Sequence, residues 1–103
     1  MKLNIRTKLA ANQDTELISV DAYTVFEIDG HKFFSHHDVS KYVPNKSWKC
    51  SEYFTGLAIT WGGYHTEDKA IEATKKILIE RRTSMDNYIE KAIRQYGYAN
   101  KED

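Results

Sequence analysis

The sequence lacks a second cysteine, a long apolar run and an excess of charge of either sign. Cys50 is the only cysteine among 103 residues, which excludes an intramolecular disulfide and favours a reducing compartment. No stretch approaches the roughly 20 apolar residues that cross a bilayer, and the N-terminal residues alternate without a run of signal-peptide length. We therefore expect a soluble, cytoplasmic chain without membrane contact.

The absence of net charge bears on the class of partner. The chain carries 15 basic and 15 acidic side chains, whereas a protein that holds phosphates needs a local excess of Lys and Arg. Most of the Lys and Arg residues of the last third are interspersed with Glu and Asp. A nucleic-acid-associated accessory protein that uses the basic residues of the C-terminal helix is therefore the alternative hypothesis, ranked below a protein-binding role.

Motifs of cofactor and metal sites are also missing. The chain contains neither G-x-x-x-x-G-K-[ST] nor G-x-G-x-x-G, and its histidines lack the paired spacing of zinc ligands. Adjacent residues of a strand face opposite ways, so His36 and His37 would diverge. We predict no cofactor and no metal.

The residue types of a nucleophilic triad occur in one short segment. Ser35, His36 and Asp38 are too close along an extended chain to line up in a hydrogen-bonded row. Cys50 shares a strand face with Trp48, which predicts a buried packing thiol. We therefore expect no enzyme. A small hydrolase or nuclease would need His31 or His36 to converge with a carboxylate in a cleft.

The first two-thirds of the chain has the alternation of β-strands. Apolar residues recur at every second position over 18–28, which predicts one long strand covered on one face. Asp29-Gly30 predicts a two-residue hairpin turn, followed by a returning strand over 31–35 with Phe33 or Phe34 pointing inward. Thr55-Gly56 predicts a second turn, returning through 57–61. A short helical turn is expected within 38–45.

The last third has helical periodicity. Thr66 is a good N-cap, and Glu67 and Asp68 place negative charge in the first turn. Apolar residues seven positions apart (Ile71, Leu78, Met85, Ala92) form one stripe that favours a single helix from Thr66 to Gly97, with two helices as the alternative. A continuous helix of that length would be about 48 Å long and would extend past a compact domain.

These patterns predict one α+β domain over residues 1–103. We expect an antiparallel sheet of four to five strands, followed by a long C-terminal helix or two helices packed on one face. The polar tail over 100–103 is expected to be loose. The overhanging part of the helix would need a cover, which is either a second copy of the chain or a partner protein.

Aromatic residues make up 13% of the chain, which is more than the core of one small sheet and helix must bury. Protein-binding hot spots are enriched in Trp, Tyr and Arg. Several tyrosines lie near turns or the tail, where exposure is expected. The predicted partner-binding residues are Tyr53, Tyr64, Arg81, Arg82, Tyr88, Tyr96 and Tyr98.

One stretch resembles known small proteins. The pattern Ser47-Trp48-x-x-Ser51-Glu52-x-x-Thr55-Gly56-x-Ala58-Ile59, followed by Gly63 and Thr66-x-x-x-Ala70-Ile71, resembles small uncharacterised proteins of phages and other mobile elements. Tyr53-Phe54, Gly56 and Thr66-Glu67-x-x-Ala70 are similar to a type I-F anti-CRISPR protein. The first 45 residues carry no resemblance. The similarity implies a non-catalytic, phage-encoded inhibitor that acts in the host cytoplasm by sterically blocking a host defence complex.

Overall fold

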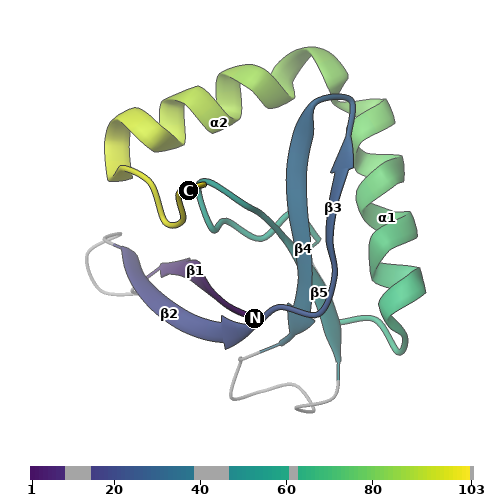
Figure 1. Ribbon diagram of the computed structural model, residues 1–103. Coiled ribbons are helices and arrows are strands. Elements are labelled where there is room, and N and C mark those ends of the chain that lie inside the picture. Colours follow the sequence, from purple (N-terminus) through teal and green to yellow (C-terminus); the bar gives the residue numbers. More distant parts are fainter. Residues whose placement is uncertain (9–14, 39–46, 61–62, 103) are drawn as a thin grey trace.

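A computed structural model describes residues 1–8, 15–38, 47–60 and 63–102 of the chain (Figure 1). Strands precede helices, which confirms the α+β class and its order along the chain. The elements are β1 (Lys2–Lys8), β2 (Thr15–Asp21), β3 (Val25–Ile28), β4 (His31–His37), β5 (Trp48–Glu52), α1 (Glu67–Glu80) and α2 (Arg82–Tyr96). The helical turn expected within 38–45 falls almost wholly outside the described residues.

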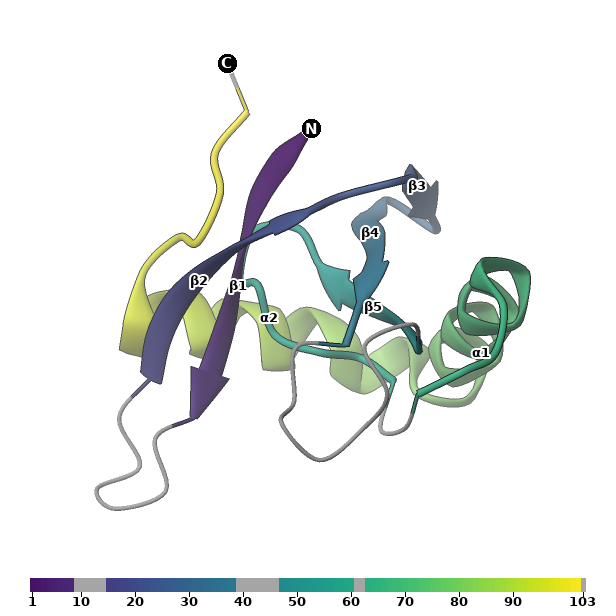
Figure 2. The same cartoon turned by 90° about the horizontal axis from the view of Figure 1, so that it is seen from below.

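The strands form two sheets. β1 pairs with β2 in an antiparallel hairpin, while β3, β4 and β5 form a separate antiparallel sheet in that order. The prediction of one sheet of four to five strands is therefore wrong. In Figures 1 and 2 the β1–β2 hairpin lies on one side of the three-stranded sheet and α1 lies on another side. α2 crosses one end of that sheet.

The single strand predicted over 18–28 is broken between β2 and β3. The Tyr23 N–H donates to the Ser35 carbonyl, and the Ser35 N–H donates to the Thr24 carbonyl, so two residues oppose one as in a β-bulge. The alternation continues through the break because its apolar residues face one core before the bend and another core after it. Sequence periodicity alone cannot detect that change.

Two hydrophobic cores lie on opposite faces of β4, the central strand of the three-stranded sheet. Phe34 packs with Leu3, Ile5 and Val20 under the β1–β2 hairpin. Phe33, the preceding residue on β4, packs with residues of the helical side. Both phenylalanines are fully buried, although neighbours on a strand point to opposite faces. β4 is therefore covered on both faces, whereas the sequence predicted one covered face.

The β3–β4 hairpin forms as predicted. Ile28 pairs with His31, which leaves Asp29 and Gly30 as a two-residue turn. Both turn residues have positive φ, 51° and 83°, as a type I′ turn requires. The return predicted over 57–61 is less regular, since within the described residues single bridges join Ser51 to Ala58 and Trp48 to Tyr64.

The helical region is divided into two helices. The Thr66 hydroxyl accepts from the Lys69 N–H at 3.2 Å and begins α1 as predicted. Arg81, with φ −120° and ψ 26°, ends α1 and precedes α2. A break of one residue barely disturbs a seven-residue repeat, so Leu78 and Met85 still enter the same core. The in-phase stripe therefore could not distinguish one helix from two.

The break removes the predicted overhang. α2 turns away from the direction of α1 and passes over one end of the three-stranded sheet (Figures 1 and 2). The described molecule measures 33 × 32 × 28 Å with a radius of gyration of 12.9 Å. Neither helix is both long enough and apolar enough to cross a membrane. α2 ends at Gly97, where φ is 83°.

The start of the C-terminal tail is ordered, contrary to prediction. Asn100 is 9% exposed, and its side-chain oxygen accepts from the Asn4 N–H at 2.8 Å. Its side-chain amide donates to the carbonyls of Asn4 and Tyr53, at 2.8 and 2.9 Å. The Asn100 side chain thereby makes the hydrogen bonds to Asn4 that a neighbouring strand would make along the outer edge of β1.

Candidate functional site

A groove beside α2 brings together Arg81, Tyr88 and Tyr96 of the predicted partner-binding residues. Arg81 and Tyr88 line a cavity of about 210 Å³ between the α1–α2 junction and residues 58–59. Tyr88 and Tyr96 line a second cavity, also of about 210 Å³, between α2 and Leu57. Because Tyr88 borders both cavities, we treat them as one feature, the α2 groove.

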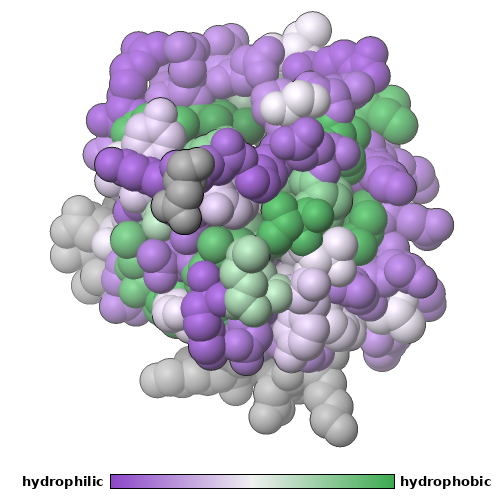
Figure 3. All heavy atoms as spheres, viewed as in Figure 1, coloured by the Kyte–Doolittle hydropathy of each residue, from purple (hydrophilic) through white to green (hydrophobic). Residues whose placement is uncertain are grey.

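One wall of the α2 groove is the inner side of α2. Met85 and Ala92 are buried and fix this side of the helix against the body of the protein. Tyr88, one turn after Met85, is 47% exposed, and its partial burial raises the pKa of its hydroxyl above the usual value. Figure 3 shows hydrophobic residues gathered below the hydrophilic outer rim of α2.

The other wall is the segment 57–59, which follows a tight turn after β5. The buried Glu52 carboxylate holds this turn by accepting from the N–H groups of Phe54 and Thr55, at 3.1 and 2.7 Å. The chain then reverses at Gly56, whose φ is 71°. Leu57 and Ile59 are thereby directed inward, while Ala58 stays exposed.

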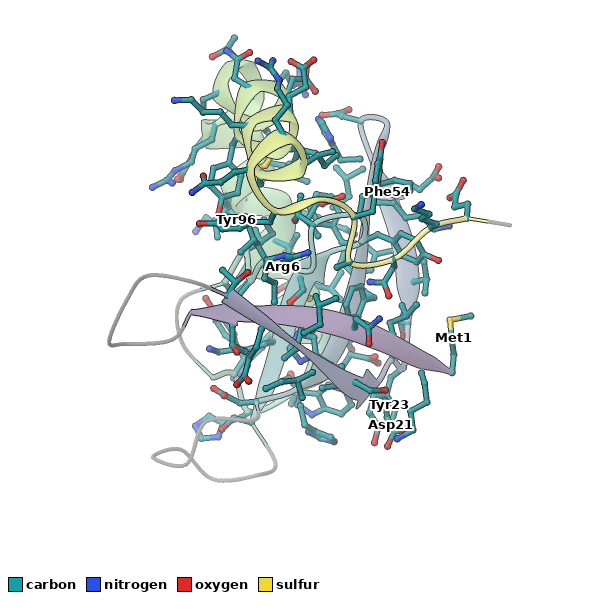
Figure 4. The ribbon with its side chains drawn as sticks, turned by 90° about the vertical axis from the view of Figure 1, so that its left-hand side faces the viewer. Met1, Arg6, Asp21, Tyr23, Phe54 and Tyr96 are labelled. Carbon is teal, nitrogen blue, oxygen red and sulfur yellow. The ribbon has the colours of Figure 1, made fainter. Side chains whose placement is uncertain are left out.

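Arg6 packs against Tyr96, which lines the groove near the C-terminal end of α2. Its guanidinium carbon lies 5.4 Å from the centre of the Tyr96 ring, a cation–π distance. Its Nε donates to the Thr55 carbonyl at 3.2 Å. Figure 4 shows Arg6 reaching from β1 toward Tyr96. The Tyr96 ring is therefore packed against the Arg6 guanidinium.

The charged residues that line the α2 groove are all basic. Arg81 lines one end and Lys91 the other, and both side chains are exposed. No Asp or Glu lines either cavity among the described residues. The groove is therefore apolar along its floor and positive at its rim, which favours an apolar ligand with acidic flanks.

The other predicted partner-binding residues lie outside the α2 groove. Tyr53 is buried, so its predicted exposure is wrong, and Lys32 lies 4.3 Å above its ring. Arg82 pairs with Asp29 at 2.9 Å. Tyr64 is half-buried beside α1, and Tyr98 is 50% exposed in the tail.

Sequence reasoning missed most of the groove wall. The return predicted over 57–61 does run beside β5 at residues 57–59, but the sequence does not indicate that these residues also border a hollow. The sequence likewise places Lys91 on a mixed helix surface. The useful signal is the Thr55-Gly56 turn, where positive φ at Gly56 returns the chain antiparallel to β5 over residues 57–59. Nothing in the sequence showed that α2 would lie beside them, because that depends on the break at Arg81.

A buried Ser–His pair lies elsewhere, on β4 and β5. The His36 Nδ1–H donates to the His37 carbonyl at 2.8 Å, so its Nε2 accepts from the Ser51 hydroxyl at 2.8 Å. The two residues are 2% and 1% exposed, and burial lowers the pKa of His36. A substrate cannot reach groups so deeply covered, and the pairing satisfies buried polar atoms.

The triad considered over residues 35–38 does not assemble around His36. The Ser35 hydroxyl instead donates to the Glu67 carboxylate at 2.6 Å, which ties the start of α1 to β4. The prediction of a buried Cys50 is confirmed, and burial raises the pKa of its thiol to about 11. Such a thiol holds very little thiolate at neutral pH.

His31 does converge with a carboxylate beside a cavity. Its Nε2 lies 3.0 Å from Asp86, and both residues line a space of about 300 Å³ with Asp29 and Arg82. The Asp86 side chain is 78% exposed, and Arg82 neutralises Asp29. No Ser, Thr or Cys lines this space among the described residues. The His31–Asp86 contact and the Arg82–Asp29 ion pair fasten the tip of the β3–β4 hairpin to α2.

No group of three or more His, Cys, Asp or Glu side chains within the described ranges is arranged to hold a metal ion. A comparison with protein-family models found no match. Comparisons with curated proteins and with solved structures also found none.

Proposed function

We propose that this protein is a non-catalytic protein-binding module whose contact surface is the α2 groove. The observation that supports this role is the set Tyr88, Met85 and Ile59 around an apolar hollow, with Arg81 at its end. Binding hot spots combine a central aromatic or arginine anchor with a pocket from which water is excluded. Here the aromatic anchor is Tyr88, which remains 47% exposed in the isolated chain.

The resemblance over residues 47–71 supplies the proposed target. It implies a phage-encoded inhibitor that binds a host defence complex with fixed stoichiometry and blocks it sterically. The groove overlaps the stretch that carries the resemblance, since Ala58 and Ile59 belong to both. The proposed mechanism needs no reaction step, because occupying the complex is sufficient to inhibit it.

Co-elution tests this proposal. The purified chain is mixed with a purified type I-F CRISPR surveillance complex and passed over a size-exclusion column, and target-DNA binding by the complex is measured in parallel. We expect a stable peak that contains both components, together with loss of DNA binding. Separate elution and unchanged DNA binding at about ten micromolar chain would contradict the proposed target.

A second candidate function rests on the outer side of α1. Lys69, Lys75 and Lys76 line a shallow hollow with Tyr64, and Glu72 is the acidic residue among its lining. Lysines near an aromatic ring are compatible with single-stranded nucleic acid. A binding constant that falls steeply as salt rises would support this alternative, and a salt-independent constant would exclude a phosphate-driven mode.

A further inference from the structure

The segment 57–60 forms the outer edge of the three-stranded sheet and faces the α2 groove. It bonds to β5 through the Glu52 N–H, which donates to the Leu57 carbonyl at 2.9 Å, and the Ile59 N–H, which donates to the Cys50 carbonyl at 3.0 Å. Ser51 and Ala58 therefore form a non-hydrogen-bonded antiparallel pair. In that arrangement the N–H and C=O of Ala58 point away from β5.

These two backbone groups of Ala58 have no hydrogen-bond partner among the described residues. Ala58 is exposed and lines the α2 groove beside Ile59 and Tyr88. The segment after β5 runs alongside α2 in two perpendicular views (Figures 1 and 2). An open strand edge thus borders the apolar hollow.

The unpaired backbone restricts what can fill the groove. A helical ligand satisfies its own backbone, so it would cover the Ala58 N–H and C=O and leave them without partners. Each buried and unsatisfied backbone group costs about 1–3 kcal/mol. An extended ligand satisfies both groups through its own main chain, as in β-strand addition. The strand edge therefore favours an extended occupant.

The charges of the groove restrict the side chains of that occupant. Arg81 and Lys91 are the charged lining residues, one toward each end of the groove, and no carboxylate balances them among the described lining residues. The floor between them is formed by apolar residues such as Met85 and Leu57. An extended peptide with apolar residues facing the floor and acidic residues near its ends fits both features.

On the basis of the proposed protein-binding function, we propose that the α2 groove captures an extended, acidic and apolar segment of the partner protein, which adds as a strand to the edge at Ala58. The strand supplies a donor and an acceptor to the Ala58 backbone. Its apolar side chains pack on Tyr88 and Met85, and its carboxylates pair with Arg81 and Lys91.

The direct test uses a blocked seven-residue peptide that alternates valine and glutamate, titrated into the isotope-labelled chain. We expect shifts in the amide signals of Ala58 and Tyr88, and slower hydrogen exchange at the Ala58 amide. The same peptide with methylated amides on one edge should bind at least about tenfold more weakly, because it cannot complete the main-chain pairing. Equal binding of both peptides, or no shift at Ala58 with about 1 mM peptide, would overturn strand addition.

Charge reversal provides a matched pair of variants. Arg81→Glu should weaken binding of the glutamate peptide at least about fivefold and strengthen binding of an alternating valine–lysine peptide. Arg94→Glu changes an exposed arginine of α2 that lines neither cavity and should leave both peptides within about twofold of the unmodified chain. Equal effects of the two substitutions would contradict the assigned role of Arg81.

Strand addition and the broader protein-binding role can fail separately. Co-elution with a defence complex that leaves exchange at the Ala58 amide unprotected would overturn strand addition while supporting the binding role. Protection that appears only as the chain dimerises, measured by light scattering, would show that the occupant is a second copy and would overturn the partner-protein assignment.

Discussion

Gly56 is the residue on which three distant segments depend. A Cβ at this position would lie 2.9 Å from the Arg6 nitrogen, 2.9 Å from the Ala99 Cβ and 3.1 Å from the Asn4 oxygen. Two of these contacts are with the backbone of β1, which cannot yield as a flexible side chain would. The absence of a side chain at Gly56 therefore allows β1, the turn after β5 and the C-terminal tail to meet.

Substitution of Gly56 should destabilise the protein more than substitution of another glycine with positive φ. Gly56→Ala is expected to lower the free energy of unfolding by about 3 kcal/mol or more, from backbone strain and overlap together. Gly30→Ala is the control, because its φ is 83° and nothing lies within 4 Å of the added carbon. Urea denaturation of both variants measures the difference, and equal losses would contradict the close approach at Gly56.

His36 predicts how stability depends on pH. Burial lowers its pKa from the ordinary value of 6.5, and the positive charge of Lys49 acts in the same direction. Asp38 and the hydrogen bond to the His37 carbonyl oppose this shift. Protonation would also remove the Nε2 acceptor that the Ser51 hydroxyl uses. The unfolded chain therefore binds the proton more readily than the folded chain.

The pKa of His36 is lower in the folded chain than the ordinary value of 6.5. Neutral His36 therefore contributes its full stabilisation above pH 6.5, and this stabilisation is lost as the pH falls toward the folded-state pKa. We expect the free energy of unfolding to fall between about pH 7.5 and about pH 5, measured by urea titration. His36→Gln should show a flatter profile over the same interval. A flat profile for the unmodified chain would refute this role of His36.

At the scale of elements, the strength of local signals decided which predictions succeeded. The Asp29-Gly30 turn, the Thr66 cap and the Gly97 terminus each depend on one or two residues with a strict backbone requirement, and all three are confirmed. The break at Arg81 carries no such signal, since no side chain caps α2. On either side of the break, Leu78 and Met85 pack into one core.

The tail after α2 behaves as part of the fold rather than as a loose end. Asn100→Ala would leave the N–H and C=O of Asn4 and the carbonyl of Tyr53 without their present partner. We expect a loss of about 2–4 kcal/mol in the free energy of unfolding. Asn87→Ala, an exposed position of α2, is the control and should change stability by less than about 0.5 kcal/mol. Similar effects of both substitutions would contradict the edge-covering role of Asn100.

At the scale of the whole molecule, the class and the order of elements followed from the sequence, but the layering did not. The burial of both Phe33 and Phe34 requires a cover on each face of β4, whereas the alternating pattern predicts a cover on one face. Three partner-binding predictions meet at the α2 groove because the helix break returns α2 to the sheet. The other four line neither cavity, although Arg82 and Tyr98 are exposed. Tyr53 is buried, which shows that a position near a turn does not determine exposure.

The central claim is that a partner protein occupies the α2 groove, and the most direct measurement compares two tyrosines of similar exposure. Tyr88 is 47% exposed inside the groove, and Tyr98 is 50% exposed outside it. Each alanine variant is titrated over an immobilised type I-F surveillance complex, and its dissociation constant is measured. We predict that Tyr88→Ala weakens binding at least about tenfold while Tyr98→Ala stays within about twofold. Equal losses, or a larger loss for Tyr98→Ala, would contradict the groove as the contact surface.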